Sequence, residues 1–171
     1  SAATFLPNLA GRILRVGVFV NADPELPARL FQDGLIDLVQ FHGDETPEDC
    51  AKFASLDIPF IKVIAVDSPA ALDMASGFQA RGVLLDAHAP GVYGGTGQTI
   101  DWNLARKFVD THPELPLILA GGITPENAAE ALAAVRPAAL DLASGSESEP
   151  GIKDFTKVAT LLTKVAQAPS R

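Results

Sequence analysis

Short apolar runs rich in β-branched residues alternate with helix-forming segments along the whole chain. This alternation is typical of repeated βα units, in which parallel strands are buried on both faces beneath their connecting helices. It predicts an α/β protein whose 171 residues form a single domain. The expected strands span residues 15–20, 38–42, 60–66, 82–87, 117–120 and 139–143.

The expected helices are marked by their first residues. In four of them a Ser, Thr or Asp stands directly before a proline, which matches an N-cap residue followed by proline at the first helical position. These four are expected at residues 24–32, 47–55, 69–77 and 125–135. Two further helices are expected at residues 101–111 and 152–166.

Composition limits the partners of the chain. With 47% hydrophobic and 20% charged residues, it matches an ordinary globular domain with a buried core. A net charge of −8 argues against nucleic acid, whose phosphates require a basic surface. A single cysteine excludes an internal disulfide, and neither a membrane-spanning stretch nor a signal peptide is evident. We therefore expect a cytoplasmic protein, monomeric or homodimeric, that binds neither nucleic acid nor membrane.

Two strand ends in the last third of the chain carry glycines and small residues. The first ends in Gly121-Gly122 before a capped helix, and the second leads through Ser144-Gly145. Free backbone N–H groups at such ends bind anions, and two of them on consecutive parallel strands can enclose one phosphate. The alternative is that these glycines only permit tight turns. The pattern favours a small phosphorylated molecule as the substrate.

The number of strands raises a question about the architecture. A (β/α)8 barrel needs eight strands in about 250 residues, whereas six are expected here. Residues 2–9 resemble the tail of a helix that precedes the first expected strand. Six parallel strands of a barrel would leave two open edges. Either the sheet is open and complete, or the first two βα units of a barrel are absent from this chain.

Six motifs give the chain a resemblance to a known family. Each is weak alone, but all occur in family order and at family spacing. The chain resembles phosphoribosylanthranilate isomerase, an enzyme of tryptophan biosynthesis, over essentially its whole length. The resemblance implies a TIM barrel of which only strands 3–8 are evident. Residues 1–171 would then form one N-terminally incomplete barrel domain. The resemblance also implies that the protein needs no cofactor or metal. The motifs lie at residues 15–21, 39–45, 84–86, 94–102, 119–127 and 141–147.

The family's reaction is an Amadori rearrangement of N-(5'-phosphoribosyl)anthranilate to 1-(2-carboxyphenylamino)-1-deoxy-D-ribulose 5-phosphate. A general acid protonates the ring oxygen and opens the furanose to a Schiff base, and a general base then removes the C2' proton. The resemblance assigns the acid to Asp86, which follows an apolar run. A carboxyl group donates a proton near neutral pH only where burial or a neighbouring charge favours its protonated form. The alternative role for Asp86 is a capping or ion-pairing carboxylate at a strand end.

The family's general base has no counterpart in this sequence. In the family it is a cysteine in a Lys-Ile-Cys-Gly type motif at the end of the first strand, and an active-site arginine follows the second strand. Both motifs are absent here. Cys50 follows a helix start and is expected to be a small buried residue. The chain as written is therefore expected to catalyse the reaction poorly or not at all.

Further candidates contact the substrate if the resemblance holds. Gln40 and His42 alternate along one strand, so their side chains share a face, although His42 could instead bind backbone. Asp141 lies in an apolar run, where a buried carboxylate is costly unless it is paired. A glycine-rich loop could close over the substrate as a lid or be plainly flexible. Its residues are Gly94, Gly95, Thr96 and Gly97.

Two other functions compete with the isomerase. A non-catalytic phosphate-ligand-binding α/β domain would explain why the phosphate motifs are present and the base is absent. An indole-glycerol-phosphate synthase is disfavoured, because no lysine stands at the strand-end positions that its chemistry would need; Lys62, inside an expected strand, is the one candidate. The acidic pairs Asp44-Glu45 and Glu147/Glu149 lack metal-ligand spacing and are expected on solvated loops.

Overall fold

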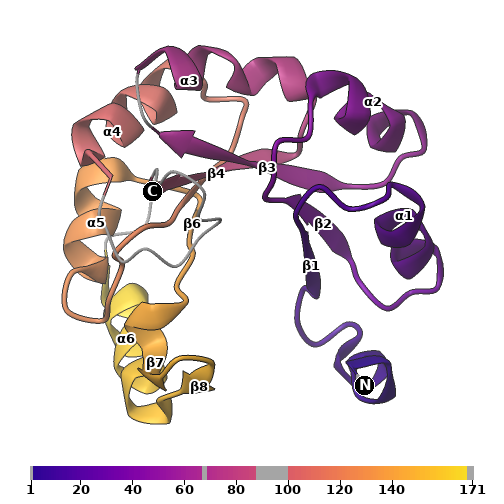
Figure 1. Ribbon diagram of the computed structural model, residues 1–171. Helices are drawn as coiled ribbons and strands as arrows, with labels where there is room; N and C mark the ends of the chain where they lie inside the picture. Colours follow the sequence, from indigo (N-terminus) through magenta and orange to yellow (C-terminus); the bar gives the residue numbers. More distant parts are fainter. Residues whose placement is uncertain (1, 67–68, 88–99, 169–171) are drawn as a thin grey trace. The chain divides into compact units, whose positions relative to one another are not determined.

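The computed structural model describes residues 2–66, 69–87 and 100–168, in which strands and helices alternate (Figure 1). The strands that alternate with helices are β1 (Val16–Phe19), β2 (Leu38–Phe41), β3 (Phe60–Val66), β4 (Gly82–Ala87), β5 (Leu117–Leu119) and β6 (Ala139–Leu140). The α-helices are α1 (Glu25–Gln32), α2 (Pro47–Ser55), α3 (Pro69–Asp73), α4 (Trp102–Thr111), α5 (Ala128–Val135) and α6 (Phe155–Gln167). The longest of these described helices has 13 residues, and none could cross a membrane.

The six strands follow one another in sequence order in a single sheet, from β1 to β6. The β1–β2, β2–β3 and β5–β6 ladders are parallel, which confirms the expected strand direction. The bounds of β3 and β4 are those expected, whereas the other four strands are shorter by one to three residues. β1 and β6 are the outermost strands of the order, in agreement with two open edges.

The chain divides into two compact units. The first unit comprises Ser1–Val63 and Met74–Val83. Its core centres on Phe41 of β2, whose ring packs edge-on against Phe53 of α2 and Phe60 of β3 at centroid distances of 4.9 and 5.6 Å. Edge-to-face aromatic pairs add stability beyond the area that they bury. α2 is thereby packed against the strands of this unit.

The expected helix starts are confirmed most clearly at α2. The Thr46 side chain accepts a hydrogen bond from the Asp49 N–H, and the Asp49 carboxylate accepts one from the Thr46 N–H. This reciprocal capping box satisfies two N–H groups that a helix start leaves unpaired. α5 differs, because residues 125–127 form turns and the helix begins at Ala128 instead of Pro125.

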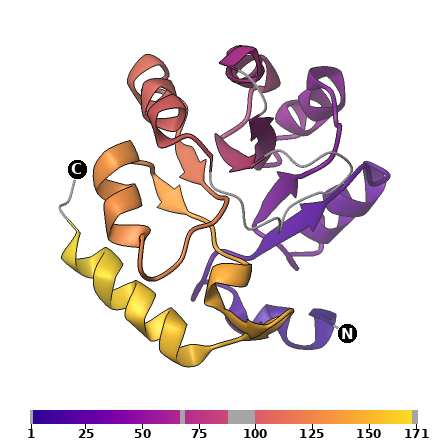
Figure 2. The same cartoon turned by 60° about the vertical axis from the view of Figure 1, so that its left-hand side comes forward.

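The second unit comprises Ile64–Asp73 and Leu84–Arg171. Helices α4, α5 and α6 follow one another along the outside of its strands (Figure 2). Its core contains Leu85 of β4, Leu117 and Leu119 of β5, and Phe108 of α4, all fully or almost fully buried. A 3-10 turn, η4 (Ser144–Ser146), follows β6 and leads into a hairpin of β7 (Glu147–Glu149) and β8 (Ile152–Lys153).

Several sequence expectations are wrong in detail. Residues 152–153 belong to the antiparallel hairpin, so the last helix begins at Phe155. The expected helix at residues 69–77 is α3 followed by a 3-10 turn, η3 (Ala75–Phe78). The N-terminal segment forms two 3-10 turns, η1 (Ala2–Thr4) and η2 (Leu6–Leu9), instead of the tail of an α-helix.

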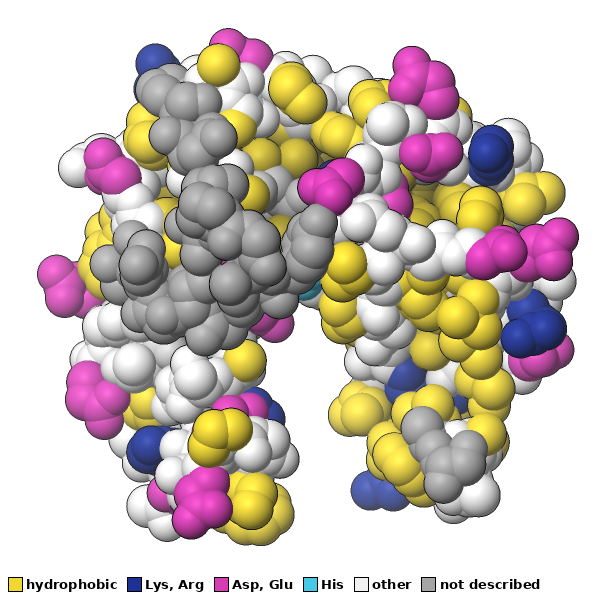
Figure 3. Space-filling view, viewed as in Figure 1, with side chains coloured by type: hydrophobic (Ala, Val, Ile, Leu, Met, Phe, Trp, Pro, Cys, Tyr) yellow, Lys and Arg dark blue, Asp and Glu magenta, His cyan; other side chains and the backbone are white. Residues whose placement is uncertain are grey.

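Burial on both faces is also wrong for β1. Val16, Val18 and Val20 are 40%, 57% and 42% exposed, and apolar side chains lie at the surface of this part of the first unit (Figure 3). These three valines alternate along the chain and share one face, which is exposed, whereas Phe19 on the other face is buried; β1 also has β2 as its one neighbour in the strand order. The sequence of β1 therefore has the apolar pattern of an inner strand, although β1 is an edge strand.

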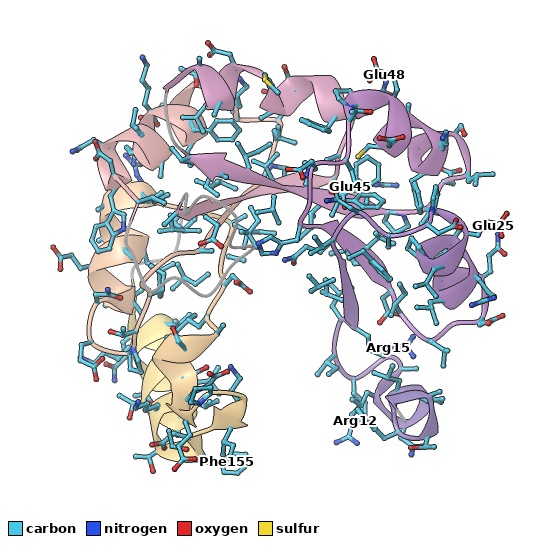
Figure 4. The ribbon with its side chains drawn as sticks, in the orientation of Figure 1. Arg12, Arg15, Glu25, Glu45, Glu48 and Phe155 are labelled. Atoms are coloured by element: carbon cyan, nitrogen blue, oxygen red, sulfur yellow. The ribbon has the colours of Figure 1, made fainter. Side chains whose placement is uncertain are left out.

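A buried arginine ties the start of β1 to the loop before β2 (Figure 4). The Arg15 guanidinium donates to both oxygens of Asp37, at 2.8 and 2.7 Å, and also to the carbonyl oxygens of Gly34 and Leu6. The backbone N–H of Arg15 donates to the same carboxylate. Hydrogen bonds from Arg15 lower the pKa of Asp37 from 3.8 to about 2. The ionised carboxylate thus contributes to the stability of the first unit.

This ion pair predicts a pH-dependent loss of stability. A carboxyl group with a depressed folded-state pKa stabilises the protein above its unfolded value, and that contribution is lost as the pH falls through the folded value. Asp37→Asn is expected to lower the free energy of unfolding at neutral pH, and the gap to the unsubstituted protein should narrow between about pH 4 and about pH 2. Urea unfolding at several pH values measures this gap. Asp33→Asn, at an exposed position at the end of α1, is the control; a gap that stays constant with pH would contradict the prediction.

Candidate active site

The second unit contains a pocket at the carboxyl ends of its strands. It is lined by Asp86 and by two loops, residues 120–123 and residues 141–145. Its volume is about 40 Å³, and one water molecule needs roughly 10–15 Å³ on the same scale. The pocket therefore has room for a small polar group. It brings together six residues expected at the site, namely Asp86, Gly121, Gly122, Asp141, Ser144 and Gly145.

Backbone hydrogen bonds between neighbouring strands place these residues together. The Ala120 N–H donates to the Leu85 carbonyl oxygen at 3.0 Å, next to Asp86. The Asp141 N–H donates to the Leu119 carbonyl oxygen at 2.9 Å. Since parallel strands end at the same edge of a sheet, the residues that follow β5 and β6 lie beside the end of β4.

The two carboxylates of the pocket differ in burial. Asp86 is only 8% exposed, and its Oδ1 accepts a hydrogen bond from the Ala87 N–H at 2.8 Å. Asp141 is exposed, which contradicts the expectation of a buried carboxylate inside a strand. The reason is that β6 ends at Leu140, so Asp141 lies in the loop that lines the pocket.

The loop after β5 has the backbone conformation that glycine favours. Gly121 and Gly122 have φ angles of 79° and 63°, which other residues adopt only with strain. Neither backbone N–H donates to an acceptor in the described part of the chain. Asn127 holds this loop, because its side chain donates to the Gly122 carbonyl oxygen and accepts from the Thr124 N–H. Sequence reasoning missed this role of Asn127, although a polar residue shortly before an apolar helix was a signal for it.

The loop after β6 is packed tightly against the loop after β5. A β-carbon on Gly145 would overlap the carbonyl oxygen of Ile123. The Lys153 ammonium group also supports this loop, because it donates to the Ala143 carbonyl oxygen, the Ser146 hydroxyl and the Glu147 carboxylate. No sequence signal pointed to Lys153, since it was expected in a helix. Gly145 is thus required for the close approach of the two loops.

Gln40 and His42 lie in the first unit. The Gln40 Nε2 and the His42 Nδ1 are 3.2 Å apart, which confirms that the two side chains share one face. Gln40 is buried and His42 is half-buried. The backbone N–H of His42 donates to the Phe19 carbonyl oxygen of β1 at 2.8 Å. The four lid residues, Gly94, Gly95, Thr96 and Gly97, lie outside the described residues.

Two further expectations concern Cys50 and the acidic pairs. Cys50 is fully buried in α2, as expected, and burial raises the pKa of its thiol to about 11. The expectation of a solvated Glu45 is wrong, because its side chain is only 7% exposed and forms an ion pair with the buried Lys62. Among the described residues, no group of three or more His, Cys, Asp or Glu side chains is placed to hold a metal ion.

Comparison with known proteins now identifies the family. A sequence model of N-(5'phosphoribosyl)anthranilate (PRA) isomerase matches residues 3–164. The chain belongs to the PRA isomerase family. The N-(5'-phosphoribosyl)anthranilate isomerase of Trichlorobacter lovleyi is 40% identical over 167 residues, which cover 98% of this chain and 79% of that protein.

Solved structures of PRA isomerases have the same fold. The enzyme from Thermus thermophilus superposes with a TM-score of 0.83 at 36% identity, over 98% of this chain and 80% of that one. Another PRA isomerase was crystallised in complex with reduced 1-(o-carboxyphenylamino)-1-deoxyribulose 5-phosphate, with a TM-score of 0.79 at 30% identity. It matches 96% of this chain and 77% of its own. These relatives, with the parallel six-stranded sheet, give the chain a TIM-barrel-like α/β fold.

The packing of the two loops leads to a prediction about stability. Gly145→Ala is expected to lower the free energy of unfolding by about 1–3 kcal/mol, because the added methyl group meets the backbone of the neighbouring loop. Gly77→Ala is a matched control, because a β-carbon there meets nothing within 4 Å, and its effect should stay within about 0.5 kcal/mol. Urea denaturation compares the two variants. Equal free energies of unfolding for the two variants would contradict the prediction, because they would show that the two loops can move apart without loss of stability.

Proposed function

We propose that the protein is an N-(5'-phosphoribosyl)anthranilate isomerase of tryptophan biosynthesis. It would convert its substrate by an Amadori rearrangement to 1-(2-carboxyphenylamino)-1-deoxy-D-ribulose 5-phosphate. The observation that carries the proposal is the pocket in which the buried Asp86 adjoins two glycine-bearing strand ends. Family membership and the relative crystallised with a reduced ribulose 5-phosphate derivative support it.

The phosphate of the substrate would be bound by backbone N–H groups. Gly121 and Gly122 contribute one loop of the pocket, and Ser144 and Gly145 contribute the other. Free backbone N–H groups bind anions without any lysine or arginine. This mode of binding suits a chain with a net charge of −8. Asp141, from the same loop as Ser144, would bind the sugar part of the substrate.

Asp86 would act as the general acid. Its proton passes to the ring oxygen of the ribose, the C1'–O bond breaks, and the anthranilate nitrogen supplies the electron pair that forms the Schiff base. Removal of the C2' proton by a base then gives an enolamine, which tautomerises to the ketone. The position of Asp86 supports this role, because its buried carboxyl group lies in the same pocket as the two proposed phosphate loops. Gln40 and His42, at the end of β2, would contact the substrate.

The general base would come from outside the 171 residues. Cys50 is unsuitable, because it is fully buried and its pKa is raised to about 11. We infer that β1 to β6 correspond to strands 3–8 of the family barrel, as part of one barrel domain, since the chain spans 79% of a relative's length. Two further βα units would carry the base. The protein would act in the cytoplasm as a monomer or homodimer, without a cofactor.

A non-catalytic phosphate-ligand-binding domain is the second candidate. The absence of the family's cysteine motif from this sequence favours it, whereas the burial of Asp86 in the same pocket as the phosphate loops favours the enzyme. Both candidates would bind the phosphorylated ligand, but only the enzyme would convert it to product.

Replacement of Asp86 separates chemistry from binding. Asp86→Asn keeps the size of the side chain but removes its acidic proton. In a chimera with two βα units of the Trichlorobacter lovleyi relative placed before Ser1, turnover of N-(5'-phosphoribosyl)anthranilate is expected to fall about 10²–10⁴-fold. Affinity for reduced 1-(o-carboxyphenylamino)-1-deoxyribulose 5-phosphate should change by less than about threefold, since the acid acts on the transition state.

The control is Asp73→Asn, at an exposed position in α3, which should leave both quantities unchanged. Asp86 is not the acid if Asp86→Asn turns over as fast as the unsubstituted chimera. The non-catalytic candidate is preferred if the unsubstituted chimera binds the reduced product and does not turn over the substrate.

A further inference from the structure

Lys62 is a charged residue in the middle of a buried strand. It lies in β3 between Ile61 and Val63, and it is only 3% exposed. An ammonium group removed from water is costly unless it is paired and hydrogen-bonded. The proposed acid and phosphate site does not use this lysine, so its burial requires another explanation.

The Lys62 ammonium group has an oxygen partner for each of its three protons. It donates to the Gly43 carbonyl oxygen at 2.7 Å, to Glu45 Oε2 at 3.1 Å and to the Phe41 carbonyl oxygen at 3.5 Å. It also lies 5.7 Å from the centre of the Phe78 ring, within the range of a cation–π contact. Lys62 therefore binds the backbone on both sides of one residue, His42.

Glu45, which directly precedes the N-cap residue of α2, completes the arrangement (Figure 4). Its side chain is 7% exposed. Besides Lys62, its carboxylate accepts hydrogen bonds from the Gly43 N–H at 3.0 Å and from the Asn21 N–H at 2.8 Å. Asn21 follows β1, Gly43 follows β2 and Lys62 belongs to β3. The ion pair thus joins three neighbouring strands at the point where His42 leaves β2.

His42 is held at its backbone and at its ring. Its N–H donates to Phe19, the peptide groups on either side of it are bound by the ion pair, and its Nδ1 lies 3.2 Å from Gln40 Nε2. Where the Gln40 amide donates this hydrogen bond, Nδ1 is the acceptor and the ring proton is on Nε2. With the ring proton on Nε2, the contacts of the backbone and of Nδ1 would fix the position of the ring.

We propose that the buried Lys62–Glu45 ion pair is a positioning element that holds His42 as an Nε2–H donor to the substrate. The inference rests on the proposed function, because the substrate contact of His42 belongs to it. Neither Lys62 nor Glu45 touches the substrate. Both act through the Phe41–His42–Gly43 backbone.

A double replacement removes the ion pair without leaving a buried charge. Lys62→Met with Glu45→Gln keeps the size of both side chains, and neutral replacement of a buried pair is tolerated better than loss of one partner. Affinity for reduced 1-(o-carboxyphenylamino)-1-deoxyribulose 5-phosphate is expected to fall about tenfold, the equivalent of one misplaced hydrogen bond. In a protein that already carries His42→Ala, the same double replacement should lower this affinity by less than about twofold, because the pair acts through His42.

Two controls separate positioning from a purely structural role. Lys52→Met, at an exposed lysine of α2, should leave the affinity unchanged. Affinity for inorganic phosphate, whose proposed site lies in the second unit, should not respond to the double replacement. An equal loss in both backgrounds, or no loss in either, would overturn the proposal.

A measurement on the unsubstituted protein needs no variant to fold. Long-range proton–nitrogen NMR correlations of His42 report which ring nitrogen carries the proton. We expect one tautomer, protonated at Nε2, whereas an Nδ1-protonated or averaged ring would overturn the positioning role. If the unsubstituted protein does not bind the reduced product, the proposed function fails, and the state of the ring still tests the positioning role.

Discussion

Two backbone hydrogen bonds between strand ends determine what the second unit can bind. The Ala120 N–H donates to the Leu85 carbonyl oxygen and the Asp141 N–H to the Leu119 carbonyl oxygen, so the end of β4 and the residues that follow β5 and β6 meet at one edge. The pocket at this edge is lined by one buried carboxylate and two small-residue loops. The direction of parallel strands therefore brings the proposed acid and the proposed phosphate loops together without any long-range side-chain contact.

Charged side chains have different roles in the two units. In the first, the Arg15–Asp37 and Lys62–Glu45 pairs are largely buried and fix backbone groups at the ends of strands. In the second, the proposed anion site depends on backbone N–H groups, so the acidic surface of the chain does not prevent phosphate binding. Exchanging a whole buried ion pair for apolar residues often costs little stability, whereas removing one partner is destabilising, and such a pair specifies one geometry where a neighbouring side chain must be oriented.

Most of the fold is encoded in local sequence signals. The apolar runs of β3 and β4 predicted those strands with their observed bounds, and Thr46 before Pro47 predicted the start of α2. The hairpin of β7 and β8 was missed, because residues 152–153 continue the apolar pattern of the following helix. The exposure of β1 depends on which strand is outermost, and a residue pattern alone does not contain that information.

The candidate site was predictable where backbone conformation demands glycine, and less so where side chains meet from distant segments. Gly121, Gly122 and Gly145 line the pocket, as their positions at strand ends suggested, whereas Asn127, Lys153 and Glu45 act through contacts that the sequence does not reveal. Titration of the ¹⁵N-labelled protein with inorganic phosphate tests the anion site residue by residue. We predict that the amide signals of Gly121, Gly122, Ser144 and Gly145 shift together and saturate; unchanged signals from these four residues, or shifts confined to other segments, would contradict a backbone phosphate site.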